Sequence, residues 1–111
     1  MLDGLKAALD TTGENFANVA WSKAPAGDYG TYYADGQEAL KTDEDSATET
    51  MLRGYVDFFC RSDKKAVIET ALRSLGIWWE LESIQFEPDT GYLHYEWRWV
   101  DTNGTVSVSG T

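Results

Sequence analysis

Residues 77–100, IWWELESIQFEPDTGYLHYEWRWV, decide the fold because they predict a β-hairpin. The tetrapeptide PDTG at 88–91 is typical of a turn, and aromatic and aliphatic residues fill both of its flanks. From residue 92 onward apolar and polar side chains alternate, which is the period of a strand with one buried face. The segment therefore predicts two antiparallel arms, residues 77–87 and 92–100.

The first arm does not keep one phase of alternation. Trp79 and Leu81 share one face of an ideal strand, whereas Ile84 and Phe86 fall on the opposite face. One extra residue in the strand would return all four side chains to a common face. We therefore expect a β-bulge near residues 82–83.

Two short helices are predicted from apolar residues at helical spacing. The first has leucines at positions 2, 5 and 9 and ends at Gly13. The second follows Asp63, which we expect to act as its N-cap, and ends at Gly76. Its apolar face consists of Ile68, Leu72 and Leu75.

Three strands are predicted before the second helix. Short strands span residues 16–21 and 29–33, with a Pro- and Gly-containing turn at 22–28 between them. A longer strand spans residues 50–61, where one face carries no charge. Between them, residues 35–49 are strongly acidic, and we expect an extended loop there, either throughout or with a brief strand around Leu40.

The order of these elements predicts an α+β fold. Strands and helices do not alternate regularly, so a doubly wound parallel sheet is not expected. We expect an antiparallel or mixed β-sheet with two α-helices packed on one face and a C-terminal β-hairpin. Residues 1–100 would form the single domain, and residues 101–111 a polar tail that stays mobile unless a partner orders it.

The acidic loop is a candidate contact region because like charges are concentrated there with a single large apolar residue. A solvated loop is the ordinary interpretation of such a stretch. The alternative is a contact with another subunit or with the lumen of an assembly. The residues that would make this contact are Glu38, Leu40, Asp43, Glu44 and Asp45.

Charge restricts the classes of partner. The 111 residues include 9 Lys and Arg against 19 Asp and Glu, a formal net charge of −10. Nucleic-acid affinity comes mostly from cations that neutralise phosphates, so specific DNA or RNA binding is not expected. Anionic membranes are disfavoured, and no stretch has the apolar length of a membrane span. The N-terminus shows no secretory signal, so we expect synthesis in the cytoplasm.

No constellation of residues predicts an enzyme. His94 is the only histidine, and we interpret it as an ordinary surface residue of a strand. Cys60 is the only cysteine and ends an apolar face, as a buried small hydrophobic residue does. Glu80 and Glu82 could pair as acid and base, but paired carboxylates on a solvent face are much commoner. We expect no catalytic residue, no cofactor and no metal site.

Aromatic residues make up 14% of the chain. Four of the five tryptophans fall on inward faces, which favours a core role. Tyr55, Phe59 and Trp78 fall on the opposite faces of their strands. Either they form an interface with another chain, or the helices cover them.

Three stretches resemble the tail-terminator (tail-completion) proteins of long-tailed phages. They are FANVAWSKAPAGDYGTYYADG at 16–36, TMLRGYVDFFCR at 50–61 with the helix beyond it, and ESIQFEPDTGYLHYEWRW at 82–99. In the last, a strand, an acidic turn and an aromatic strand close the domain.

The resemblance implies a structural virion protein without catalytic residues. Its copies would form a ring, expected to be a hexamer, on the end of the tail tube. The ring would stop tail polymerisation and offer a surface to head-connector or neck proteins. An acidic lumen would let DNA pass without binding it. The alternatives are another neck, tail-tube or head-closure subunit of the virion, or a monomeric acidic module that binds a protein.

Replacing Asp43, Glu44 and Asp45 together with Ser tests the contact interpretation of the acidic segment. The change removes three charges from a solvated stretch, so the protomer should stay folded while ring assembly or tail joining fails. Circular dichroism reports folding, and electron microscopy of assembled particles reports tail joining. Normal tail lengths and infectivity would show that the segment is only a solvated loop.

Overall fold

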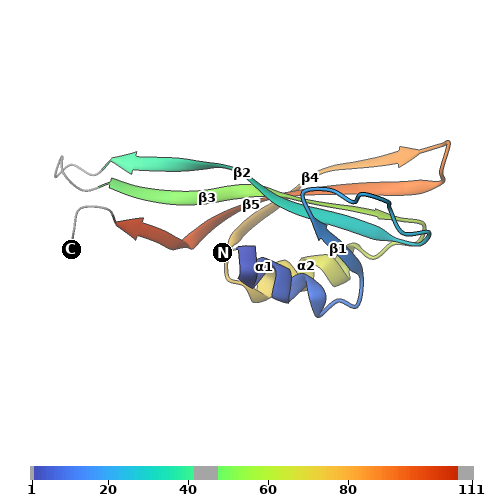
Figure 1. Ribbon diagram of the computed structural model, residues 1–111, viewed down its shortest axis with the longest axis horizontal. Helices are drawn as coiled ribbons and strands as arrows, with labels where there is room; N and C mark the ends of the chain where they lie inside the picture. The colour runs from blue at the N-terminus through green and yellow to red at the C-terminus, as the bar shows by residue number, and fades with distance from the viewer. Residues whose placement is uncertain (1, 42–47, 108–111) are drawn as a thin grey trace.

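A computed structural model describes the backbone of residues 2–41 and 48–107, and the side chains of residues 2–36 and 52–101 (Figure 1). The chain forms two helices and five strands. In chain order these are α1 (Leu2–Asp10), β1 (Asn15–Asn18), β2 (Tyr29–Lys41), β3 (Thr48–Cys60), α2 (Lys65–Ser74), β4 (Trp78–Glu87) and β5 (Tyr92–Ser107).

The five strands form one mixed sheet in the order β1-β2-β3-β5-β4. β1 pairs with β2 in parallel, and every other pairing is antiparallel. Both helices lie side by side on the same face of the sheet (Figure 1). The predicted α+β class is therefore confirmed, including the C-terminal hairpin formed by β4 and β5.

The core lies between the helices and the central strands. Each helix buries its apolar face, and β3 and β5 turn alternate residues toward it, as their sequence alternation predicts. The fully buried large side chains are Leu5 and Leu9 of α1, Ile68 and Leu72 of α2, Val56 and Phe58 of β3, and Trp97 and Trp99 of β5. A polar contact also joins the layers: the Trp97 indole Nε1–H donates to Glu69 Oε2 at 2.9 Å.

The start of α2 differs by one residue from the sequence prediction. The N-cap position is Lys64, whose side chain makes no capping hydrogen bond. Asp63, which was expected there, lies one residue earlier and accepts the backbone N–H of Lys65 at 2.9 Å. Asp63 Oδ1 also accepts the hydroxyl of Tyr95 at 2.9 Å, so this carboxylate connects the helix start to the sheet.

The strands differ in length from the sequence predictions at three places. β1 ends at Asn18 and not at residue 21, because Val19 adopts a left-handed conformation with φ of 69°. The extended loop expected over residues 35–49 is wrong where the backbone is described, since 35–41 and 48–49 are strand. The brief strand considered around Leu40 is part of β2. β5 continues past Val100 to Ser107 instead of ending there.

Backbone pairing explains these longer strands. β2 passes a register shift between Ala34 and Gly36 and then stays paired with β3 as far as Lys41. β5 pairs with β3 again through Val106 and Ser107. These segments are mostly polar, so a search for hydrophobic alternation does not find them. The hydrogen bonds between neighbouring backbones are enough to form the strand.

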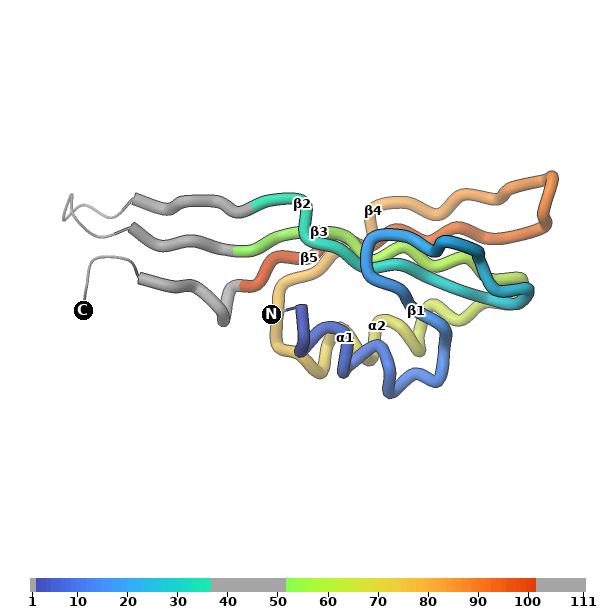
Figure 2. The backbone as a smooth tube through the Cα atoms, in the orientation of Figure 1, coloured from blue at the N-terminus to red at the C-terminus, as the bar shows by residue number. Residues whose placement is uncertain are grey.

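The predicted bulge in β4 is confirmed as a register shift between Leu81 and Ser83. The loop at 19–28 folds back to the start of β2 (Figure 2). Trp21 anchors it by donating its Nε1–H to the carbonyl oxygen of Gly30 at 2.9 Å. No helix in the described part of the chain is long and apolar enough to cross a membrane.

Gly54 is a position where only glycine fits. It lies opposite Ala34 on β2 and Trp99 on β5. A Cβ atom there would overlap the carbonyl oxygen of Tyr33 and lie 2.7 Å from the Ala34 Cα and 2.8 Å from the Trp99 ring. Two of these neighbours are backbone atoms, so they can move only if the strands separate.

We expect Gly54→Ala to lower the free energy of unfolding by about 3 kcal/mol, at the upper end of overpacking costs. Urea denaturation followed by tryptophan fluorescence measures the change. Gly27→Ala is the matched control, because a Cβ there meets no atom within 4 Å. It should change stability by less than about 0.5 kcal/mol. Equal stability of the two variants would contradict the packing argument.

Candidate functional site

The face of the sheet opposite the helices carries a row of stacked rings. Tyr29 of β2 stacks on Phe59 of β3 with centroids 5.0 Å apart, and Phe59 stacks on His94 of β5 at 4.1 Å. Tyr92 meets Tyr29 edge-on at 5.9 Å. Its hydroxyl donates to the carbonyl oxygen of Gly27 at 3.0 Å, so the loop after β1 closes this end of the row.

The three predicted interface aromatics all lie on this face. Tyr55 and Phe59 are half-buried, and Trp78 is 43% exposed. Tyr55 neighbours the Tyr33 ring at 5.9 Å, and the Arg98 guanidinium lies over the Trp78 ring at 5.8 Å. The helices are on the other face and do not cover these side chains. Their role as an interface stays a prediction.

A cluster of titratable groups occupies the middle of the same face. Asp57 is only 8% exposed, and its Oδ1 lies 2.9 Å from Nε2 of His94. Glu96 is the register neighbour of Asp57 on β5. Burial and the adjacent Asp57 carboxylate raise the pKa of Glu96. The hydrogen bond to Asp57 raises the pKa of His94.

His94 therefore differs from the ordinary surface histidine that the sequence suggested. It lies on the predicted face with Glu96 and Arg98, but its side chain is only 20% exposed and bonds to Asp57. Its partner is 37 residues away in the sequence, so only the pairing of β3 with β5 brings them together. The arrangement can store a proton between two carboxyl groups and an imidazole.

Other candidate chemistry gains no support from the geometry. Within residues 2–36 and 52–101, no group of three or more His, Cys, Asp or Glu side chains is placed to hold a metal ion. Burial raises the pKa of the Cys60 thiol and so disfavours the reactive thiolate. Glu80 and Glu82 are both exposed, and the β4 bulge follows between Leu81 and Ser83.

An ionic contact that the sequence did not indicate holds the base of α2. The Lys64 ammonium lies 2.7 Å from Asp28 Oδ2 and 3.1 Å from Glu14 Oε1. Both carboxylates raise the pKa of Lys64. The contact joins the helix to the segments on either side of β1, and residues so far apart give no local sequence signal.

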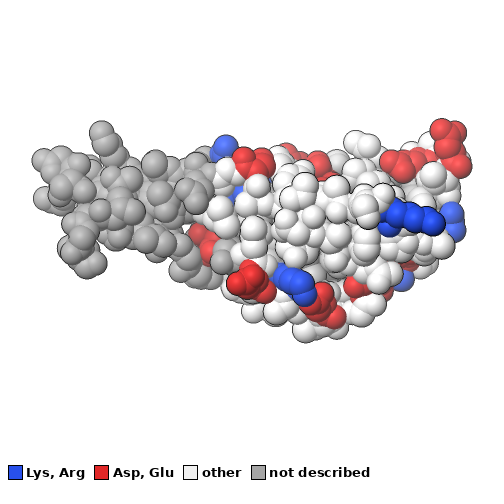
Figure 3. All heavy atoms as spheres, viewed as in Figure 1, with Lys and Arg blue, Asp and Glu red and all other residues white. Residues whose placement is uncertain are grey.

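Besides Trp78, the edge strand β4 exposes two large apolar side chains near the hairpin turn. Ile84 is 52% exposed and Phe86 is 62% exposed. Their register partners Tyr95 and Leu93 turn toward the helix side of the sheet, but the hairpin extends beyond the helices (Figure 1). Acidic side chains gather over the end of this hairpin, at the upper right of Figure 3.

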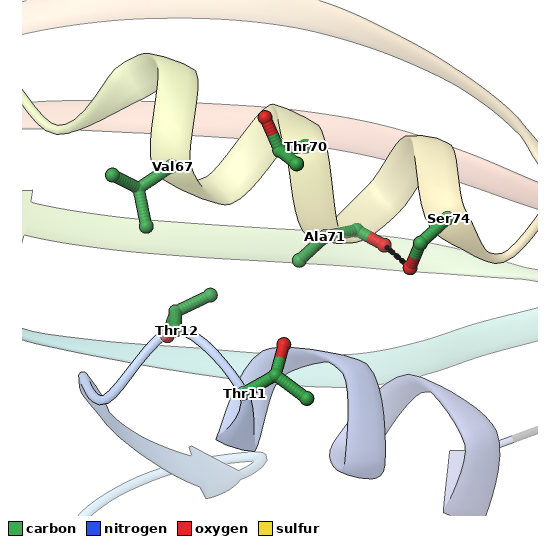
Figure 4. Close-up of a pocket in the computed structure, with 6 residues that line it drawn as sticks. All are labelled: Thr11, Thr12, Val67, Thr70, Ala71 and Ser74. Carbon is green, nitrogen blue, oxygen red and sulfur yellow. Dashed lines mark hydrogen bonds between the residues drawn. The ribbon is translucent and has the colours of Figure 1, made fainter.

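A shallow groove of about 340 Å³ separates the ends of α1 and α2 (Figure 4). It is lined by Thr11, Thr12, Val67, Thr70, Ala71 and Ser74. Val67 and Ala71 point from α2 toward the two threonines that follow α1. The sequence analysis did not single out this groove, because its lining residues are short and common.

The structure does not describe the predicted acidic contact region in full. Glu38 and Leu40 lie in β2, in a part where only the backbone is described. Asp43, Glu44 and Asp45 lie outside the described residues. The proposed role of these five residues stays a prediction.

We expect Glu96→Gln to stabilise the protein at neutral pH by about 1 kcal/mol, because it removes repulsion from Asp57. A raised pKa means that the folded protein binds this proton more tightly than the unfolded chain does. Stability therefore falls as pH rises from 4.5 through the folded pKa. The advantage of the variant should appear across that window and vanish below pH 4.5.

Thermal unfolding between pH 4 and pH 8 measures this effect. Glu80→Gln is the control, since Glu80 is exposed and lies opposite Arg98 on β5. It should give no stabilisation at any pH. A Glu96→Gln variant that is less stable than the parent at pH 8 would show that the carboxylate is favourably bound in the cluster.

Comparison with known proteins assigns no family. No family model matches the sequence, and no curated protein matches it. A solved structure with a similar chain is the virion of a native gene transfer agent particle, with a TM-score of 0.48 and 10% identity. The match covers 87% of this chain and 81% of that chain. A TM-score of this size does not establish a common fold.

Proposed function

We propose that the protein is a non-enzymatic structural subunit of a phage-like virion. In this role its copies form a ring, expected to be a hexamer, on the end of the tail tube. The ring terminates tail polymerisation and presents a surface to the head connector. The observation that carries the proposal is a long sheet with one uncovered face and an edge strand that exposes Ile84 and Phe86.

Exposed apolar side chains on an edge strand favour assembly. Edge strands of monomers are usually short or blunted by charge, because their free backbone groups pair with other chains. β4 has ten residues and carries Glu80, Glu82 and Glu87, but Ile84 and Phe86 lie two positions apart on it and are both exposed. Side chains of this size exposed together are typical of a contact with another chain.

The resemblance of three sequence stretches to tail terminators supports a position for this assembly at the end of the tail tube. The net charge of −10 agrees with a ring through which DNA passes, since an acidic wall does not hold phosphates. The acidic residues 43–45 are our candidates for that wall. Tail-tube protein and neck proteins are the partners that the role requires.

In this role we assign His94 a structural part in the sheet and not a catalytic one. His94, the one histidine of the chain, has Nε2 bound to Asp57 and its ring stacked on Phe59. These two contacts fix the position of the imidazole ring on the face of the sheet. The groove between the helices lies on the other side of the sheet from this cluster.

Native mass spectrometry and negative-stain electron microscopy of the purified protein test this role. We expect closed rings of six copies, alone or on the ends of isolated tail tubes. Cells that produce the virion without this protein should release heads and overlong tails that are not joined. Joined particles of normal tail length in its absence would contradict the proposal, as would turnover of a small molecule by a lone protomer.

A second candidate is a monomeric acidic module that binds another protein through its aromatic face. The half-buried Tyr55 and Phe59 and the exposed Trp78 favour it, because aromatic rings dominate contact surfaces. Size-exclusion chromatography in the presence of tube ends separates the two candidates. A species that remains monomeric there, and is absent from purified virions, would favour the module.

A further inference from the structure

We propose that residues 19–21 form a strap with two positions, a folded-back one and an extended one that closes the open edge of β2. In the folded-back position, which the structure holds, the chain leaves β1 after Asn18 and runs back to the start of β2 (Figure 2). In the extended position the same residues continue β1 along β2. The inference concerns a single protomer, so it stands apart from the proposed assembly.

Val19 forms a strained turn at the point where β1 ends. Its N–H still donates to the Tyr32 carbonyl oxygen at 3.0 Å, as the next bond of the parallel ladder, but its φ is 69°. The N–H of Ala20 then donates to the carbonyl oxygen of Asn18 at 2.8 Å, which closes a γ-turn of the rare kind with positive φ. A β-branched side chain disfavours this conformation. An extended Val19 would release the strain.

Packing does not compensate for the strain at Val19. Its side chain is 64% exposed, the largest value among the large apolar residues whose side chains the structure describes. Valine favours strands, and residues 16–21 have the alternation of a strand. The local preference of the chain and the observed conformation therefore disagree at this residue.

The edge of β2 that would receive the strap is open. β1 pairs with β2 only as far as Tyr32, whereas β2 continues to Lys41. Beyond Tyr32, no strand in the described part of the chain pairs with this edge. Alternate residues of β2 turn their backbone groups toward it, and Ala34 is the next one after Tyr32. Such an edge can pair with a strand of another chain, and an extended strap would prevent this.

The register of β1 determines what the extended strap would contact. Asn15 lies opposite Tyr29, and the same offset would set Val19 opposite Tyr33. Residues directly opposite each other share a face of the sheet, so the Val19 methyl groups would pack beside the Tyr33 ring. The Ala34 N–H would donate to the Val19 carbonyl oxygen, which repeats the pattern of the existing ladder.

The loop after the strap is long enough for both positions. In the extended position Trp21 would lie about 20 Å along β2 from Tyr29, at 3.3 Å per residue. The chain from Trp21 to Tyr29 can span about 26 Å. The far end of the loop can stay in place, where Asp28 accepts the backbone N–H of Arg61 at 3.2 Å and binds the Lys64 ammonium at 2.7 Å. Only the near end has to move.

Trp21 holds the near end in the folded-back position. Its side chain is half-buried, and its Nε1–H donates to the Gly30 carbonyl oxygen at 2.9 Å. The position of the strap therefore depends on a balance between this anchor and the strain at Val19. Each contribution changes an equilibrium by about tenfold, so we expect the extended position in about 1–10% of molecules.

NMR relaxation dispersion on the purified full chain tests the strap, because it detects minor states of this size. We expect exchange at the amides of residues 19–21 and of Ala34. Trp21→Phe keeps a ring but removes the donor, so it should raise the extended population about fivefold and give an NOE between the Val19 methyl groups and the Tyr33 ring. Val19→Gly should lower that population about tenfold, because glycine adopts positive φ without strain.

Ala20→Gly is the matched control, because it adds backbone freedom in the same segment and leaves the strain at Val19. It should keep the extended population within about twofold of the parent. Flat dispersion profiles at Ala34 in both the parent and Trp21→Phe would overturn the inference. Equal populations in Val19→Gly and Ala20→Gly would also overturn it, since chain flexibility and not strain would then govern the exchange. If Trp21→Phe does not fold, the parent and the two glycine variants decide.

Discussion

Two short helices have to cover a sheet that is much longer than they are. α1 has nine residues and α2 has ten, whereas β5 has sixteen. At 1.5 Å per helical residue, α2 is about 15 Å long. At 3.3 Å per strand residue, sixteen fully extended residues would span at most about 53 Å, and the molecule measures 53 Å along its longest axis. The helix layer therefore covers only the middle of one face, where Trp97 and Trp99 are buried.

The uncovered face is stabilised by contacts within the sheet itself. Rings from neighbouring strands stack along it, as Tyr29, Phe59 and His94 do. Such pairs contribute about 0.5–1.5 kcal/mol each beyond the area they bury. The cost on this face is electrostatic, because Asp57 and Glu96 lie side by side and His94 compensates only one carboxylate. The stability of this face therefore depends on the protonation of Glu96 and His94.

The sequence predicted the parts of the fold whose signal is local. The alternation in residues 50–61 and 92–100, the bulge before Ser83 and both helices were read correctly because a buried face leaves a period in the sequence. The ends of β2 and β5 were not, because their mostly polar sequences carry no hydrophobic alternation, and the backbone pairing with β3 forms those ends of the strands. β1 ends early because Val19 has a positive φ angle, and valine gives no sequence signal for that conformation.

The candidate surfaces were predictable only in part. Strand phase placed Tyr55, Phe59 and Trp78 on the outward faces of their strands and left open whether the helices cover them. The structure puts the helices on the other face. Ile84 and Phe86 were placed on one face correctly, but their exposure depends on how far α2 extends, which is a tertiary property. The groove and the bond between Asp57 and His94 both join segments distant in the sequence.

Net charge explains how such a protein can expose apolar side chains and avoid random association. Copies with a charge of −10 repel one another at distances up to the Debye length, about 8 Å at physiological salt. Only a contact that sets carboxylates of one copy against ammonium or guanidinium groups of another escapes this repulsion. Open edges of two acidic hairpins cannot meet that condition. The net charge that keeps protomers apart therefore disfavours direct pairing between two copies of the β4 edge.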